Sequence, residues 1–358
     1  MALPNKIRSL QVSVNQLLNW FLDDRSLILD IEGAHRPAEI AKHIVAAYSI
    51  VNDIHGHNNA TSIKNLKSFD PAAYKNENDK DYVKNIFDIF EFVNLHLSHF
   101  LNNFILHGSL ATVDYSKGWS DVDTFVIINN DTMMNFEKLI ALREKCLNLK
   151  NVFYKICPLQ HHGLIVFTEA DLRAYQMNYI PIEALEDACE FLASAQSLVV
   201  SLDNRKEDEN IFTTTRLEAI KRIAKIGWES DWFCHHPYNG ECLKGGYRND
   251  SNAMRQLFWL LGNVMTMPAY LMTGIGQPCS KKNSFLRASA YYSTDSSKFI
   301  ESATLIRKTW SENEYLNYKG NAIPNWIKGI LENEYLKNFY LLISETLEII
   351  YTQRHHKL

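Results

Sequence analysis

Two short segments carry the strongest signal in the chain: Leu106-His107-Gly108-Ser109 and, after eleven intervening residues, Asp121-Val122-Asp123. The apolar run that stops at Gly108 predicts a strand ending in a sharp turn, because only glycine readily takes a positive φ. Ser109 is a good N-cap residue for a short helix over 110–114. The N–H groups of such a turn, together with the serine hydroxyl, predict a cradle suited to phosphate.

The two aspartates extend this prediction to a metal. Asp121 and Asp123 are two residues apart on a strand predicted over 121–128, so both carboxylates share one face while Val122 points into the core. Two carboxylates roughly 7 Å apart repel each other unless a cation lies between them. A hard divalent cation with oxygen ligands fits that place. A phosphate cradle beside paired acids predicts metal-assisted phosphoryl or nucleotidyl transfer.

The pattern resembles the signature of the DNA polymerase β-type nucleotidyltransferase superfamily, in particular its small-molecule, antibiotic nucleotidyltransferase-like members. That signature is a hydrophobic residue, Gly and then Gly or Ser, followed after a similar gap by Asp-hydrophobic-Asp. The resemblance implies a nucleoside triphosphate, with ATP as the first expectation, bound together with Mg²⁺ or Mn²⁺. It places Gly108 and Ser109 at the β- and γ-phosphates and Asp121 and Asp123 at the metal.

The implied activity is that of an enzyme. A nucleotidyltransferase of this kind moves a nucleoside monophosphate from the triphosphate to a hydroxyl or phosphate of an acceptor and releases pyrophosphate. We expect a small-molecule acceptor, with a protein or tRNA acceptor as the second choice. A non-catalytic nucleotide-binding protein on the same fold is the alternative from another functional class.

The chain departs from this signature at two positions beside the motif. His107 and Thr124 stand where the family has hydrophobic residues, directly before Gly108 and directly after Asp123. His107 lies next to the predicted turn and is therefore a further candidate for the site.

A third departure concerns the third carboxylate that most active members carry on a later strand. The matching stretch, 157–164, contains no acid. Either His161 or His162 replaces it, or an acid beyond the strand, Glu169 or Asp171, swings in, or the enzyme is weakened. Adjacent residues of a strand face opposite sides, so at most one of the two histidines points at the site. We take His162 as the candidate catalytic base that accepts the acceptor's proton.

A second cluster of candidates lies in the helical half of the chain. The stretch 274–285 contains Lys281 and Lys282, and it resembles the segment after the corresponding helix in several small-molecule-type members of the superfamily. Ser284 could cap a helix there, and the two lysines would supply positive charge for a triphosphate. The alternative is a solvated loop with ordinary surface lysines.

The organisation of the chain favours an α+β fold, with a nucleotidyltransferase-like mixed sheet flanked by helices. We expect an N-terminal helical segment over 1–98 that packs on a catalytic module over 99–205, followed by an all-helical domain over 206–358. Short strands are predicted at 152–156 and 164–167. The charged stretch 204–210 is the best candidate for a linker.

Composition limits the partners and the compartment. The formal charge of −4 over 358 residues does not predict a strongly basic surface, although a local basic groove is compatible with it, so nucleic acid is the less favoured partner. Six scattered cysteines without a CxxC pair favour reduced thiols and a cytoplasmic protein. The uncharged stretch 256–280 is interrupted by Pro268, Gly274 and Gly276, so we expect a buried helix there and no membrane partner.

Overall fold

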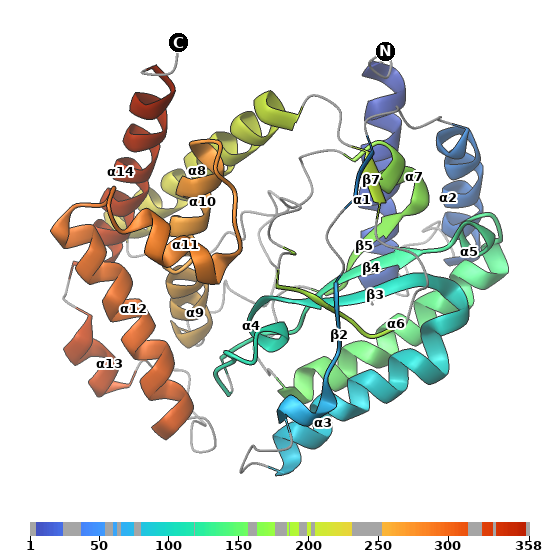
Figure 1. The fold of residues 1–358 in the computed structure, drawn as a ribbon, viewed down its shortest axis with the longest axis horizontal. Helices are drawn as coiled ribbons and strands as arrows, with labels where there is room; N and C mark the ends of the chain where they lie inside the picture. The colour runs from blue at the N-terminus through green and yellow to red at the C-terminus, as the bar shows by residue number, and fades with distance from the viewer. Residues whose placement is uncertain are drawn as a thin grey trace. The chain divides into compact units, whose positions relative to one another are not determined.

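The computed structural model divides the chain into two compact units, Met1–Asn204 and Arg205–Leu358, and each is described by itself (Figure 1). The described residues are 5–23, 37–53, 60–62, 66–74, 80–117, 119–156, 163–175, 185, 187–192, 199–201, 205–230, 253–313, 324–331 and 334–355. Among them, no helix is both long enough and apolar enough to cross a membrane.

A five-stranded mixed sheet forms the centre of the first unit, in the order β2-β6-β3-β4-β5. Strand β3 is antiparallel to both β6 and β4, whereas β4 is parallel to β5 and β2 is parallel to β6. A separate antiparallel pair joins β1 and β7. The strands are β1 Ala60–Ser62, β2 Lys67–Ser68, β3 Leu101–His107, β4 Asp123–Ile128, β5 Ile165–Thr168, β6 Cys189–Glu190 and β7 Val199–Ser201.

Helices surround this sheet, so the unit has the mixed α and β composition that the sequence predicts. Helices α3 and α6 lie side by side along the sheet (Figure 1), and α1 and α2 both pack on α6. The helical elements of the unit are α1 Asn5–Asp23, α2 Pro37–Asn52, η2 Pro71–Tyr74, α3 Lys80–Phe92, η3 Val93–Leu97, η4 Ser98–Phe100, α4 Gly108–Ala111, α5 Asn130–Met133, α6 Phe136–Ile156 and α7 Glu169–Arg173.

Helix α1 closes the outer edge of the sheet at β5. The Val166 N–H donates to Oδ1 of Asn19 at 2.8 Å. The Val166 carbonyl accepts from the side chains of Asn15 and Asn19 at 2.9 and 3.0 Å. An unpaired strand edge is a template for unwanted association. The side-chain amides of Asn15 and Asn19 therefore satisfy the main-chain groups of Val166, as a sixth strand would at this edge.

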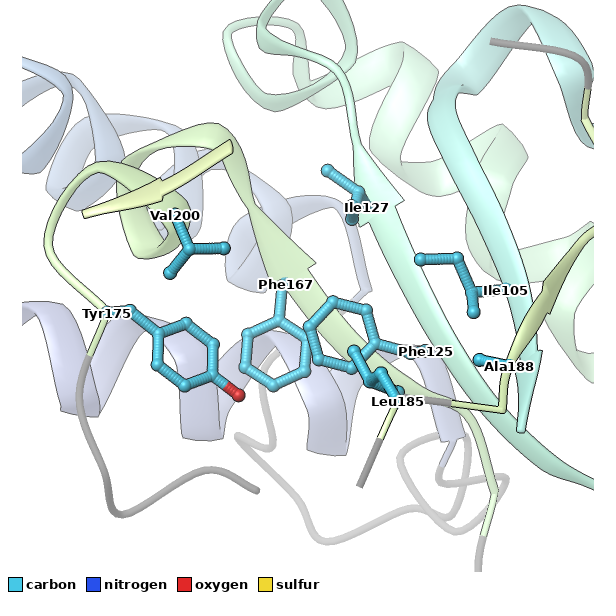
Figure 2. Packing of buried hydrophobic residues seen from close by; sticks show 8 residues of the cluster. All are labelled: Ile105, Phe125, Ile127, Phe167, Tyr175, Leu185, Ala188 and Val200. Atoms are coloured by element: carbon cyan, nitrogen blue, oxygen red, sulfur yellow. The ribbon is translucent and has the colours of Figure 1, made fainter. Parts of the chain in front are cut away.

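The two faces of the sheet have separate apolar cores. On one face the rings of Phe125 and Phe167 stack with their centroids 4.1 Å apart, and Ile105, Tyr175 and Leu185 pack around them (Figure 2). On the other face an aromatic cluster links the sheet to α3: Phe191 contacts Phe104 of β3, Phe90 of α3, and Phe69, which directly follows β2. Burial on both faces explains why β4 is a nearly continuous run of β-branched and aromatic residues.

The second unit is helical throughout its described residues. Helix α10 packs on α8, α11 and α14, and Gly274 permits the approach to α14, since a Cβ there would lie 2.3 Å from Cδ1 of Ile350. Its helices are α8 Arg205–Ser230, α9 Ala253–Val264, α10 Met267–Gly274, α11 Lys281–Ala288, α12 Thr294–Asn313, α13 Asn325–Ile330 and α14 Tyr335–His355.

Three local predictions differ from the structure. The strand predicted over 152–156 is the last part of α6, and the linker predicted over 204–210 lies largely in α8. The long uncharged stretch 256–280 contains two helices, because α9 ends at Val264 and Pro268 opens the first turn of α10. Proline fits at the start of a helix but interrupts its interior.

Candidate functional site

The turn at the end of β3 depends on glycine, as the sequence predicts. Gly108 has a φ of +70°, in the left-handed region. Helix α4 begins at Gly108 with His107 at the N-cap, so the prediction that Ser109 caps this helix is wrong. The chain enters the helix one residue earlier than expected because Gly108 itself makes the turn. Ser109 therefore lies within the first turn of α4.

Strand register brings Asp123 directly to this turn. The pair His107 and Asp123 is the last one between β3 and β4, which places Gly108 beside the start of β4. A Cβ on Gly108 would lie 2.2 Å from Oδ2 of Asp123, far inside van der Waals contact. The Asp123 carboxylate thus occupies the space that any other residue at position 108 would fill.

Asp121 lies two residues before Asp123 in the chain but outside the sheet. Strand β4 begins at Asp123, so Asp121 precedes the strand, contrary to the prediction that both belong to it. The expected alternation is still present: Asp121 and Asp123 are half-buried, and Val122 between them is fully buried. The structure therefore brings Gly108 against Asp123, and Ser109 and Asp121 lie next to them along the chain; we call these four residues the turn site.

The loop between α4 and Asp121 is tied down at both ends. At its start, the Asp114 N–H donates to the Ser109 carbonyl at 2.9 Å. At its end, the Ser120 N–H donates to the Ser116 carbonyl, and the Ser116 N–H donates to Oγ of Ser120, both at 2.8 Å. Within the first of these turns, Val113 has a φ of +54°, which is strained for a β-branched residue.

Tyr74 anchors α4 from a distant part of the chain. Its hydroxyl donates to the Leu110 carbonyl, and its ring stacks on that of Tyr115 with the centroids 5.9 Å apart. Burial raises the pKa of Tyr74, so the hydroxyl keeps the proton that it donates. The sequence contains no signal for this contact, because it depends on how η2 packs on α4.

The two acids considered as a third carboxylate lie at the wrong end of the sheet. Glu169 and Asp171 follow β5, whose last residue, Thr168, pairs with Ile128 at the far end of β4. At about 3.3 Å per residue, that end is roughly 16 Å from Asp123. The prediction that either acid swings into the site is therefore wrong.

Both acids are also fully engaged where they are. Asp171 is 2% exposed, and its carboxylate accepts from Gln11, from Asn15 and from both the N–H and the hydroxyl of Thr168. Glu169 accepts from Asn102 and from the main chain and side chain of Asn130. These bonds cap α5 and α7, so both acids have a structural role.

A different acid approaches the start of β5. A Cβ on Gly163 would lie 1.8 Å from Oδ1 of Asp23, at the end of α1. That carboxylate already pairs with Nζ of Lys150 on α6 at 2.8 Å. Sequence analysis did not single out Asp23, because its position follows from the packing of α1 against β5. Within the described ranges, no three histidines, cysteines or acids form a group that could hold a metal ion.

The structure does not place the remaining candidate residues, two histidines and two lysines, in the turn site. His161 and His162 fall outside the described residues. Lys281 and Lys282 belong to the second unit, where both are exposed in the first turn of α11. Ser280, not Ser284, is the N-cap residue of that helix, and the Ser284 hydroxyl donates to the Lys281 carbonyl instead.

Comparison of the chain with models of protein families, with curated proteins and with solved structures gave no match.

Proposed function

We propose that the protein is a Mg²⁺-dependent nucleotidyltransferase, which transfers a nucleoside monophosphate from a triphosphate such as ATP to a hydroxyl or phosphate of a small molecule. The contact between Gly108 and the Asp123 carboxylate carries this proposal. It joins the two halves of the motif, a glycine turn and a carboxylate pair, which are separated by eleven residues in the sequence.

The arrangement of elements supports the same assignment. A strand, the Gly-Ser turn, a short helix, the strand that begins at Asp123, a long helix and a parallel strand follow one another in β3, α4, β4, α6 and β5. This is the order we expect for a nucleotidyltransferase-like module. On this proposal, the helical second unit is the domain that follows the catalytic module.

The carboxylates fit a hard divalent cation. Asp121 and Asp123 offer oxygen ligands from two half-buried side chains on either side of a buried valine. Mg²⁺ is commonly held by one or two carboxylates together with substrate phosphates and water. When bound there, the cation would neutralise charge on the phosphate oxygens. The aspartates would fix its place relative to the turn.

The turn itself would hold the triphosphate tail. The first N–H groups of a helix have no partner within the helix, and in α4 these belong to Gly108 and Ser109. Together with the Ser109 hydroxyl they would donate to phosphate oxygens. Lys281 and Lys282 stay predicted contacts of the same triphosphate, and His162 stays the predicted proton acceptor.

Charge supports a small acceptor over a nucleic acid. The unit that contains the turn site has 17 Lys and Arg residues against 25 Asp and Glu residues, a formal charge of −8. A nucleic-acid surface normally needs an excess of basic groups to neutralise phosphates. An acidic unit favours a small or cationic acceptor instead.

Thermal unfolding with Mg²⁺ and each nucleoside triphosphate tests this proposal. At a ligand concentration of 100 Kd we expect about 2.7 kcal/mol of stabilisation, or roughly 5–10 °C in Tm. Asp121→Asn and Asp123→Asn should abolish the shift. Asp131→Asn is the matched control, because Asp131 lies on α5 and pairs with Lys138 at the surface.

Pyrophosphate release separates the functional classes. Release that depends on a small-molecule fraction of an extract, and is lost in Asp123→Asn, supports the transferase. Release that depends on a protein or tRNA fraction supports the second choice of acceptor. A Tm shift without release under any of these conditions supports a non-catalytic nucleotide-binding protein, and no shift with any triphosphate overturns the proposal.

A further inference from the structure

The ladder between β3 and β4 includes Asp123 but does not extend to Asp121. Asp123 is part of β4, where ladder hydrogen bonds to β3 fix its main chain. Asp121 comes before the strand, so the ladder does not hold it. A carboxylate pair that shares one cation must nevertheless keep its two members in a fixed relation. Something outside the sheet has to position Asp121.

The neighbouring residues supply two fixed points. On one side of Asp121, Val122 is fully buried. On the other side, Ser120 is 4% exposed and is tied to Ser116, also 4% exposed, by reciprocal 2.8 Å hydrogen bonds. A third bond, from the Trp119 N–H to the Ser116 carbonyl at 3.0 Å, tightens the same loop. The five-residue loop over 116–120 is therefore closed immediately before Asp121.

The two serines contribute differently to this closure. Ser116 takes part in these bonds through its N–H and its carbonyl, so its side chain is not needed for them. Ser120 contributes its own hydroxyl as the acceptor for the Ser116 N–H. Without that hydroxyl, a buried N–H loses its acceptor, which is costly, and the loop loses one of its two reciprocal bonds.

We propose that Ser120 is a positioning residue of the turn site, which holds Asp121 in place for the metal–nucleotide complex by closing the 116–120 loop through its hydroxyl. This inference rests on the proposed function. Ser120 touches neither metal nor nucleotide in this role and acts through the adjacent carboxylate.

Three variants of the full chain separate positioning from general structure. Ser120→Ala removes the acceptor and should weaken binding of Mn²⁺ with a non-hydrolysable ATP analogue about tenfold, an effect of the size seen when a supporting shell around a metal site is lost. Ser120→Thr keeps a hydroxyl and should restore binding to within about threefold of the wild type. Ser13→Ala is the control, because the exposed Ser13 hydroxyl donates to the Ser9 carbonyl within α1, and it should bind like the wild type.

The readout is the dissociation constant of Mn²⁺ in the presence of the analogue, followed by electron paramagnetic resonance, with thermal unfolding measured on the same samples. If the wild type binds and Asp123→Asn does not, while Ser120→Ala binds as well as the wild type, the role of Ser120 is overturned and the proposed function stands. If the wild type does not bind Mn²⁺ with the analogue, both the proposed function and the role of Ser120 are overturned.

A measurement on the unmodified protein covers the case in which Ser120→Ala does not fold. Amide hydrogen exchange of the Ser116 N–H should slow at least tenfold when Mg²⁺ and the analogue are added, because they stabilise the closed loop. The Thr132 N–H, which donates to Oδ1 of Asn129 at 2.8 Å at the far end of β4, should not respond. Equal exchange of Ser116 with and without ligand overturns the inference.

Discussion

Acidic side chains stand at both ends of strand β4, and their surroundings differ. At the far end, Asp171 is buried and its carboxylate accepts four hydrogen bonds from α1 and Thr168. At the near end, Asp121 and Asp123 are half-buried, and the Asp123 carboxylate lies so close to Gly108 that it leaves no room for a side chain there. The first arrangement uses an acid to hold helices in place. The second holds an acid pair beside a turn whose N–H groups suit phosphate.

The comparison shows why acids near a sheet cannot be assigned to a site by type alone. Glu169 and Asp171 satisfy the sequence requirement for a third carboxylate, yet the parallel pairing of β4 with β5 carries them to the opposite end of the sheet. Their hydrogen bonds then show what they do there. The difference between the two ends should appear in stability at one end and in ligand binding at the other.

The largest effect on stability should come from Asp171→Asn. This change removes the negative charge and replaces one acceptor oxygen with an NH₂ donor that faces the donors Gln11, Asn15 and Thr168, and it should lower the free energy of unfolding by about 3 kcal/mol. Asp123→Asn should change that free energy by no more than about 0.5 kcal/mol. Urea denaturation of both variants measures the difference, and equal losses would remove the distinction between the two ends.

A smaller effect is expected at the glycine turn. Gly108→Ala must displace the Asp123 carboxylate as well as strain the backbone, so it should cost about 2–3 kcal/mol and abolish nucleotide binding. The matched control is Gly276→Ala, since Gly276 has a φ of +78° but nothing within 4 Å of a Cβ, and it should cost only about 1 kcal/mol. Nucleotide binding retained in Gly108→Ala would contradict the role given to the turn.

Alkaline pH should destabilise the protein through Tyr48, which lies at the far end of β4. Burial raises the pKa of Tyr48 to about 12, and its hydroxyl donates to Asn130, directly after β4. A pKa raised above the unfolded value of 10 gives stability that is complete below pH 10 and is lost as the pH rises toward 12. Tyr48→Phe should therefore reduce the slope of stability against pH in this window by about 1.4 kcal/mol per pH unit. An unchanged slope above pH 10 would contradict this.

The smallest effect separates two threonines on neighbouring strands. Thr124 is fully buried, and within the described residues its hydroxyl has no hydrogen-bond partner, so Thr124→Val should raise the free energy of unfolding by about 1 kcal/mol. The hydroxyl of Thr168 bonds to Asp171 at 2.8 Å, so Thr168→Val should lower it by about 1–2 kcal/mol. Differential scanning calorimetry distinguishes these opposite signs, and a loss in both variants would count against this assignment of the two hydroxyls.

Short-range chemistry made parts of the fold and site predictable from the sequence. The positive φ of Gly108, the burial of Val122 and the start of a strand near Asp123 depend on local conformational preference and alternation. Contacts between elements far apart in the chain could not be predicted from the sequence. Residues 152–156 have apolar spacing that suits a strand or a buried helix, and only the packing of α6 beside α3 decides between them.

The supports of the turn site were hidden for the same reason. Ser120 directly precedes Asp121 of the motif, but its bond to Ser116 depends on how the loop between them closes. Tyr74 reaches Leu110 from a segment more than thirty residues earlier, and no spacing rule connects them. Outside the turn site, Asp23 reaches Gly163 only because α1 packs on β5.

The most direct test is a crystal structure of the chain with Mg²⁺ and a non-hydrolysable ATP analogue. The proposed function predicts one metal ion bound by Asp121 and Asp123, with the triphosphate against the N–H groups of Gly108 and Ser109. A nucleotide bound elsewhere, or a metal ion that contacts neither aspartate, would contradict it.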